Sequence, residues 1–258
     1  MKENKGLYKA VFTDIDGTFE FRDKEILGYN LSVVQKVRSL GVKVFINTGR
    51  SCAMLPKELD AKMNFDGAVM GNGSHIILGG KTIFEAYLDN DFLKKSYEFF
   101  EKESEWIAYE GDEKILFRNA GYNENALELT NFAEFEKMIE KYRINKLSYG
   151  GGKAIGDKIS LLYPDKDIIQ QEYYGELMLK NLGKESGIKK LCAMLGIKKE
   201  ETVAIGDSMN DFKMIGFAGM GIAMGNGIEA VKKHADFVCG KAENGGFGDA
   251  LKKVFDIK

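Results

Sequence analysis

Apolar residues and turn residues alternate near the N-terminus in the order strand, helix, strand. Residues 8–13 form an apolar, β-rich run that ends in an aspartate-containing turn, which predicts a strand. From Asn30, the predicted N-cap, apolar residues recur at helical spacing as far as Gly41, where the helix is expected to stop. A second strand is predicted over residues 42–46. This order forms a βαβ unit, and such units build parallel sheets covered by helices.

The same pattern returns near the C-terminus. A helix is predicted over residues 184–195, with Gly196 at its end, and an apolar strand over 202–205 leads into an acidic turn. Further expected elements are short strands at 221–224 and 236–239, a helix at 227–234 and a final helix from Gly246. Two such ends, separated by a different middle, indicate one α/β domain interrupted by an insertion.

The middle of the chain has a different pattern of predicted helices and strands, which indicates an inserted mixed α/β domain. Its expected elements are helices at 91–104 and 123–141, a hairpin of strands 106–109 and 114–117, and strands at 145–149, 158–163 and 175–180. We therefore predict a Rossmann-like parallel-sheet core formed by residues 1–81 and 182–258, with residues 82–181 as an inserted α/β cap.

Composition limits the expected partners and location. The 258 residues include 37 basic and 39 acidic side chains, so the basic surface that nucleic-acid binding requires is not expected. The first ten residues are charged and do not read as a signal peptide, and no apolar run approaches the ~20 residues that a membrane span needs. Cys52, Cys192 and Cys239 are scattered, as is usual in a reducing compartment, which predicts a cytoplasmic protein.

Two carboxylates follow the first predicted strand. Asp14 and Asp16 have a spacing that turns both side chains to one side while the strand geometry lasts. Ligands of open α/β sheets bind beyond the carboxyl ends of the strands. A pair of carboxylates there suits a reaction in which one attacks and the other transfers a proton. The alternative interpretation is a pair of turn or helix-capping aspartates.

A second acidic turn, residues 206–211, follows another predicted strand. Its carboxylates, Asp207 and Asp211, are expected at the same edge of the sheet as the first pair. Oxygen ligands without histidine or cysteine nearby suit a hard cation, and Mg²⁺ is the natural one. The alternative is that Asp207 or Ser208 caps the helix that follows.

Candidate phosphate ligands follow the second strand and open a later helix. Thr48 and Gly49 offer a hydroxyl and backbone N–H groups that can hold a phosphate oxygen, although a helix cap explains them equally well. Lys184 opens a predicted helix, where a lysine is more often a solvated surface charge. Four carboxylates would repel a phosphate monoester unless cations intervened, and Mg²⁺ with Lys184 would supply that compensation. The four motifs therefore make chemical sense as one site.

These motifs, in this order, resemble those of the haloacid dehalogenase (HAD) superfamily. The matching residues are Asp14-Ile15-Asp16-Gly17-Thr18, Thr48-Gly49-Arg50, Lys184 and Gly206-Asp207-x-x-Asn210-Asp211. The large insertion between the second motif and the lysine is similar to the cap of the Cof-type (IIB) subfamily. The segments Met70-Gly71-Asn72-Gly73 and Ala223-Met224-Gly225-Asn226 also resemble that subfamily. One departure is Glu185, where members of the family usually have glycine.

The resemblance implies a role for each matching residue. Asp14 would be the nucleophile that forms an aspartyl-phosphate, and Asp16 would protonate the leaving alcohol and then deprotonate the attacking water. The implied Mg²⁺ ligands are Asp14, Asp207 and the backbone carbonyl of Asp16, with Asp211 holding the metal or its waters. The implied phosphate-binding residues are Thr48, Gly49, Lys184 and Asn210.

The resemblance also implies a Mg²⁺-dependent phosphatase that acts on a small phosphorylated metabolite, with sugar phosphates as the favoured class. Two alternatives stay open: a phosphomutase or phosphotransferase on the same scaffold, and a non-catalytic protein that binds a metabolite. The intact pair of Asp14 and Asp16 weighs against the second, since binding alone does not require a nucleophile. The sequence names neither the physiological substrate nor the oligomeric state, and the residues that set specificity are expected within 82–181.

Overall fold

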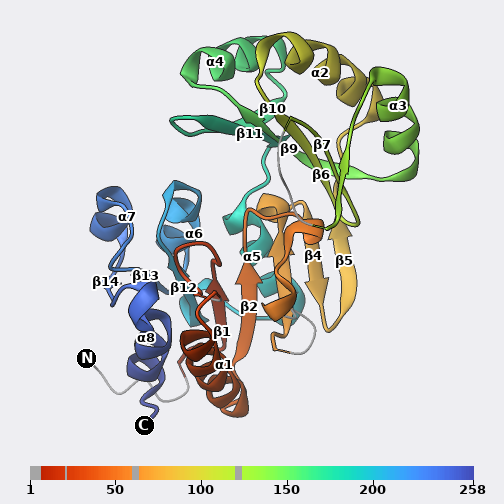
Figure 1. Cartoon of the computed structure of the whole chain (residues 1–258). Helices are drawn as coiled ribbons and strands as arrows, with labels where there is room; N and C mark the ends of the chain where they lie inside the picture. Colours follow the sequence, from red (N-terminus) through yellow and green to blue (C-terminus); the bar gives the residue numbers. More distant parts are fainter. Residues whose placement is uncertain (1–6, 21, 60–63, 120–123) are drawn as a thin grey trace. The chain divides into compact units, whose positions relative to one another are not determined.

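The structure is a computed structural model that describes residues 7–20, 22–59, 64–119 and 124–258 (Figure 1). The chain forms two compact units. Unit 1 consists of Met1–Gly49, Pro56–Ile83 and Gly183–Lys258, and unit 2 consists of Arg50–Leu55 and Phe84–Leu182. The first six residues, which belong to the segment considered as a signal peptide, lie outside the described ranges.

Unit 1 is built on an eight-stranded sheet in the order β14-β13-β12-β1-β2-β3-β4-β5 (Figure 1). Its strands are β1 (Ala10–Thr13), β2 (Lys43–Asn47), β3 (Gly67–Met70), β4 (His75–Leu78), β5 (Lys81–Glu85), β12 (Thr202–Gly206), β13 (Met220–Ala223) and β14 (Phe237–Val238). The strands from β14 to β3 are parallel, and β4 pairs with β3 in the antiparallel direction. This confirms the predicted parallel-sheet core, and β3, β4 and β5 extend it beyond the strands that the sequence predicted.

Helices cover the central strands of this sheet. They are α1 (Lys24–Ser39), α5 (Lys184–Leu195), α6 (Phe212–Phe217), α7 (Glu229–His234) and α8 (Gly246–Phe255). All four residues of β1 are buried, as expected for a strand between two layers of helices. Helices α1 and α8 pack against one another, and α5 packs against α6. Among the residues that the structure describes, no helix combines the length and the apolar character that a membrane span requires.

The start of α1 corrects the predicted N-cap. The helix begins at Lys24 because the carboxylate of Asp23 accepts hydrogen bonds from two backbone N–H groups of the first turn, at 2.9 and 3.0 Å. Asn30 instead lies buried inside the helix, where its Oδ1 accepts a hydrogen bond from the backbone N–H of Gly248 at 3.2 Å. A partner that comes from α8 could not be read from the residues around Asn30.

Unit 2 contains a six-stranded sheet in the order β10-β11-β9-β6-β7-β8, with helices on one face (Figure 1). The elements are α2 (Asn90–Glu103), β6 (Ile107–Gly111), β7 (Ile115–Arg118), β8 (Ala126–Glu128), α3 (Phe132–Lys141), β9 (Ile144–Gly150), α4 (Lys153–Leu162), β10 (Lys166–Gln170) and β11 (Tyr174–Leu179). Neighbouring strands are antiparallel except β7 and β8, which are parallel. Phe100, Tyr109, Phe135 and Tyr149 lie in its hydrophobic core. The predicted mixed α/β fold of the insertion is confirmed.

The segment 158–163, which the sequence predicts as a strand, is instead the last part of α4 and its C-terminal cap. Ile159 is buried in the core of unit 2, and Ile155 packs against that core four residues earlier. Residues four apart share one face of a helix. Leu161, which a strand would turn to the same side as Ile159, is 83% exposed. The prediction is wrong because alternating apolar residues here fall on two sides of a helix.

The helix predicted over 123–141 begins later than expected. Residue 123 lies outside the described ranges, and β8 occupies part of the predicted helix. Helix α3 begins at Phe132 because Asn131 caps it, with its Oδ1 accepting a hydrogen bond from the backbone N–H of Glu134 at 3.0 Å. The capping asparagine was the available signal for this boundary.

The segment Arg50–Leu55 belongs to unit 2, whereas the sequence places it in the core. Ala53 packs against Ala108 and Ile115 of the sheet of unit 2. The backbone oxygen of Ala53 also accepts a hydrogen bond from Asn125 Nδ2 at 3.1 Å. These contacts join residues that are far apart in the sequence, so a division drawn along the chain could not anticipate them.

Candidate active site

The carboxyl ends of β1, β2 and β12 meet at one edge of the sheet of unit 1 (Figure 1). The central strand β1 pairs in parallel with both neighbours over its whole length. The residues that follow the strands therefore emerge together: Asp14 after β1, Thr48 after β2 and Asp207 after β12. This edge is where open α/β sheets bind their ligands.

Asp14, Asp207 and Asp211 form a cluster of carboxylates at this edge. Each offers one oxygen, and the three oxygens lie within 4.8 Å of one another. Asp14 and Asp211 are buried, and Asp207 is half-buried. Carboxylates at this spacing can bind one hard cation, so the structure brings together the side chains of three of the four predicted metal ligands. The resemblance assigns only a backbone carbonyl to the fourth, Asp16.

Lys184 is the first residue of α5, and its side chain enters the carboxylate cluster. The side chain has no exposed surface, and its Nζ lies 2.6 Å from Asp14 Oδ1 and 2.6 Å from Asp211 Oδ1. The same ammonium donates a hydrogen bond to Asn210 Oδ1 at 3.2 Å. The solvated surface lysine considered as the alternative is therefore excluded. Of the residues predicted to bind phosphate, Lys184 contacts Asp14 directly and Asn210 contacts Lys184.

Glu185, the departure from the family pattern, leaves the position of Lys184 intact. Its carboxylate pairs with Lys189 on the next turn of α5, with Oε1 and Nζ 2.6 Å apart. Such a pair between residues four apart lies along the surface of a helix. The extra side chain is therefore accommodated on α5 itself.

Asp211 holds the acidic turn in shape. Its Oδ2 accepts hydrogen bonds from the backbone N–H groups of Asp207 and Ser208 at 2.9 and 3.0 Å, while its Oδ1 faces Lys184. A Cβ on Gly206 would lie 2.4 Å from the Asp211 side chain, so glycine is required at that position. Asp211 thus has a structural bonding role in the turn, and its charge also enters the carboxylate cluster.

Asp16 is placed differently from Asp14. Its side chain is 47% exposed, and its Oδ1 lies 3.6 Å from Nη2 of Arg22. The next residue, Gly17, has φ +75°, so the chain leaves strand geometry at once. The two aspartates therefore occupy different environments, one buried against Lys184 and one near solvent.

Thr48 and Gly49 lie beside two asparagines. The backbone oxygen of Thr48 accepts a hydrogen bond from the backbone N–H of Asn72 at 3.2 Å. A Cβ on Gly49 would lie 3.2 Å from Asn72 Oδ1 and 3.5 Å from Asn210 Nδ2, so glycine leaves room for both side chains. Asn72 is buried, with φ 52°, a conformation that asparagine tolerates. It was not among the predicted site residues, although its Gly-Asn-Gly turn was a visible signal.

The cluster carries more negative than positive charge. Burial, reinforced by the charge of Asp211 and opposed by Lys184, raises the pKa of Asp14 to about 8. Burial and the charge of Asp211 also raise the pKa of Asp207, to about 6. Burial disfavours the ammonium of Lys184, but the neighbouring Asp14 and Asp211 outweigh it and raise the lysine pKa. A divalent cation would neutralise the excess of three carboxylates over this ammonium.

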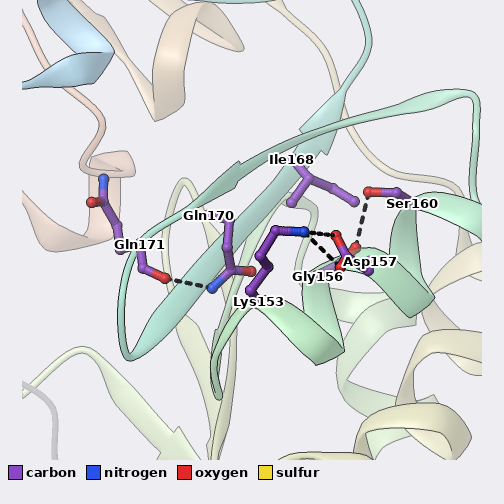
Figure 2. A pocket seen from close by; sticks show the side chains of 7 residues that line it. All are labelled: Lys153, Gly156, Asp157, Ser160, Ile168, Gln170 and Gln171. Carbon is purple, nitrogen blue, oxygen red and sulfur yellow. Dashed lines mark hydrogen bonds and ion pairs between the residues drawn. The ribbon is translucent and has the colours of Figure 1, made fainter.

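Unit 2 contains a pocket of about 390 Å³ beside α4 and β10 (Figure 2). Its polar side chains bond within the protein: Lys153 Nζ lies 2.7 Å from Asp157 Oδ2, and Gln170 Nε2 donates to the backbone oxygen of Gln171 at 2.7 Å. The charged groups of this pocket, Lys153 and Asp157, pair with each other, whereas the edge of the unit 1 sheet gathers three carboxylates around one ammonium. The carboxylate cluster is the better candidate for chemistry.

This chain is similar in sequence and in fold to known hydrolases and phosphatases. A family model for haloacid dehalogenase-like hydrolases matches residues 11–251. The putative phosphatase YkrA of Bacillus subtilis is 26% identical over 97% of this chain and 99% of its own length. A phosphoglycolate phosphatase of Methanosarcina acetivorans is 26% identical over 95% of this chain and 96% of its own. The HAD subclass IIB sugar phosphatase BT4131 shares the fold, with a TM-score of 0.81 and 24% identity over 97% of this chain and 100% of that one.

Proposed function

The chain belongs to the haloacid dehalogenase-like hydrolases and is a phosphatase, and from this premise we propose that it hydrolyses a small phosphorylated metabolite through a phosphorylated Asp14. The observation that carries the proposal is the buried contact of 2.6 Å between Asp14 Oδ1 and Lys184 Nζ, inside the carboxylate cluster. The ammonium opposes the effect of burial and lowers the pKa of Asp14, and a bound cation would lower it further, which favours the charged carboxylate that a nucleophile requires.

The donor set fits Mg²⁺. Asp14, Asp207 and Asp211 offer oxygen atoms within reach of one ion, and no histidine or cysteine belongs to this group of described residues. With the backbone carbonyl of Asp16, these residues would hold the ion. When bound, Mg²⁺ would offset the negative charge that accumulates as a phosphate approaches the carboxylates.

The proposed reaction has two steps. An oxygen of Asp14 attacks phosphorus, the bond between phosphorus and the ester oxygen breaks, and Asp16 gives a proton to the departing alkoxide. Water then attacks the aspartyl-phosphate, Asp16 takes back a proton from that water, and inorganic phosphate leaves with Asp14 restored. The exposure of Asp16, 47% for its side chain, supports this role because the leaving group must exchange with solvent.

Four residues are proposed to hold the phosphoryl group. They are Thr48 through its hydroxyl, Gly49 through its backbone N–H, Lys184 through its ammonium and Asn210 through its amide. A chain of contacts supports the assignment: Lys184 contacts both Asp14 and Asn210, and the space above Gly49 is bounded by Asn72 and Asn210.

We assign the role of substrate selection to residues 82–181, which unit 2 largely contains, and we favour sugar phosphates as the substrate class. The similarity to a phosphoglycolate phosphatase supports a small phosphorylated metabolite. The near balance of 37 basic and 39 acidic residues argues against a nucleic-acid substrate. The scattered positions of Cys52, Cys192 and Cys239 in the sequence support the proposed cytoplasmic location.

The test is phosphate release from a panel of sugar phosphates and phosphoglycolate, with Mg²⁺ and with EDTA. Asp14→Asn keeps the size of the side chain and should lower turnover by at least about 10³-fold. The exposed Asp256→Asn is the matched control and should retain full activity. Release that survives EDTA or Asp14→Asn would refute the mechanism. An isomerised sugar phosphate with little free phosphate would identify a phosphomutase instead.

A further inference from the structure

The loop that joins β13 to α7 is fastened to the acidic turn. The backbone N–H of Met224 donates to the carbonyl of Gly206 at 3.0 Å, and the backbone N–H of Ile228 donates to the carbonyl of Asp207 at 2.9 Å. The two acceptors are Gly206 and Asp207 itself, so these bonds tie the loop to the backbone at Asp207. The loop contains Asn226, which has no part in the reaction proposed above.

The side chain of Asn226 connects this loop to the turn that follows the nucleophile. Its Nδ2 donates a hydrogen bond to the backbone oxygen of Gly17 at 2.7 Å. Its Oδ1 accepts a hydrogen bond from the backbone N–H of Ala242 at 2.9 Å, which fixes the orientation of the amide. Because an amide has distinct donor and acceptor ends, the second bond selects the donor for Gly17.

Gly17 lies tightly against Asp207. A Cβ on Gly17 would be 2.3 Å from Asp207 Oδ2, and the hydroxyl of Thr18 lies 3.4 Å from Asp207 Oδ1. The turn after Asp14 and the carboxylate of Asp207 therefore meet in direct contact. A small shift of this turn would change the separation of two proposed Mg²⁺ ligands.

We propose that Asn226 is a positioning residue that fixes the Asp14–Thr18 turn against Asp207 and thereby sets the affinity for Mg²⁺; this inference rests on the proposed function. Asn226 is exposed, so its hydrogen bonds contribute little to the core. Groups that orient metal ligands from outside the coordination sphere commonly change metal affinity when they are removed. The loss of Asn226 should therefore act on the metal site and leave the fold intact.

Asn226→Ala should raise the dissociation constant for Mg²⁺ by about 10–100-fold in calorimetric titration of the full chain. Without metal, hydrogen exchange of peptides that cover residues 14–19 should become faster, while the melting temperature in EDTA stays within about 2 °C of the wild type. The matched control is Asn244→Ala, another exposed asparagine close in sequence to Ala242, which should change none of these values.

The two readouts separate this inference from the proposed function. If the hydrogen exchange of the 14–19 peptides is unchanged in Asn226→Ala, the positioning role is overturned, whether or not the wild type binds Mg²⁺. Equal Mg²⁺ affinity in the variant and the wild type would overturn it as well. A wild type that takes up no Mg²⁺ would refute the proposed metal site, and the inference with it. A tenfold or greater loss of affinity together with faster exchange would support both.

Discussion

Replacing Lys184 with methionine removes the ammonium that lies between Asp14 and Asp211 and keeps most of the side-chain volume. The exposed fractions of the three side chains are 0%, 4% and 0%, so the two carboxylates would stay buried without their counter-charge. Breaking a buried ion pair by removing one partner costs about 3–5 kcal/mol, since water does not take the place of the lost charge. We expect a loss of this size in metal-free protein at pH 9.

The size of the loss should depend on pH. The pKa of Asp14 is already raised, to about 8, by burial, and it would rise further without Lys184. A folded carboxyl group with a raised pKa binds more protons than the unfolded one, so the free energy of unfolding falls as pH rises above about 4. At pH 5 Asp14 can take up a proton, and the difference between Lys184→Met and the wild type should shrink. Mg²⁺ should recover part of the loss at pH 9.

Urea unfolding in EDTA, followed by circular dichroism at pH 5 and pH 9, measures this effect. Fluorescence is less suitable because the single tryptophan, Trp106, lies in unit 2. The matched control is Lys189→Met on the same helix, whose ammonium pairs with Glu185 at the surface with 55% of its side chain exposed. That variant should lose less than about 1 kcal/mol. A loss below about 1 kcal/mol at pH 9 for Lys184→Met, or one equal to the control, would refute the reasoning.

Three further outcomes are expected. Gly17→Ala, at φ +75° and with its new methyl 2.3 Å from Asp207 Oδ2, should lower the free energy of urea unfolding by about 1–3 kcal/mol and weaken Mg²⁺ binding in a titration. Gly187→Ala should destabilise the protein by a similar ~1–3 kcal/mol in thermal unfolding, because the new methyl would lie 2.3 Å from a valine of β3. Its control, Gly28→Ala, places the methyl in open space and should not destabilise the protein. Wild-type protein in EDTA should lose stability from about pH 4 to pH 8, because burial raises the pKa of Asp14 and of Asp207. Mg²⁺ should flatten that dependence, and a flat stability profile in EDTA would contradict the prediction.

The sequence predicted those parts of the site that depend on strand order. Asp14, Thr48 and Asp207 each follow an apolar strand, and parallel strands bring their carboxyl ends to one edge without further information. Lys184 was predicted at the start of its helix and is found there. Its burial between two carboxylates depends on the packing of α5 against β3 and α6, which no local pattern around Lys184 records.

The residues that were missed or misjudged act through long-range contacts. The amide of Asn226 bonds to Gly17, and Asn30 bonds to Gly248, partners that lie more than two hundred residues away in the sequence. The strand predicted at 158–163 failed for a related reason. A short apolar run fits two periods, and only the sheet of unit 2 determines which side chains of α4 are buried.

The order in which the chain is made has a consequence for when the reaction centre forms. Unit 2 comes almost wholly from one continuous stretch, Phe84–Leu182, while unit 1 is assembled from three. Strand β1 is made early, yet it pairs with β12, from Ala10 beside Thr202 onward. A chain whose residues 202–206 have not yet left the ribosome therefore carries an N-terminal strand with one edge unpaired. Long-range strand pairing is slow, and an unpaired strand edge is prone to aggregation in the meantime. Newly made chains should depend on chaperones most during the interval before β12 emerges, and nascent chains that end before it should show no phosphatase activity.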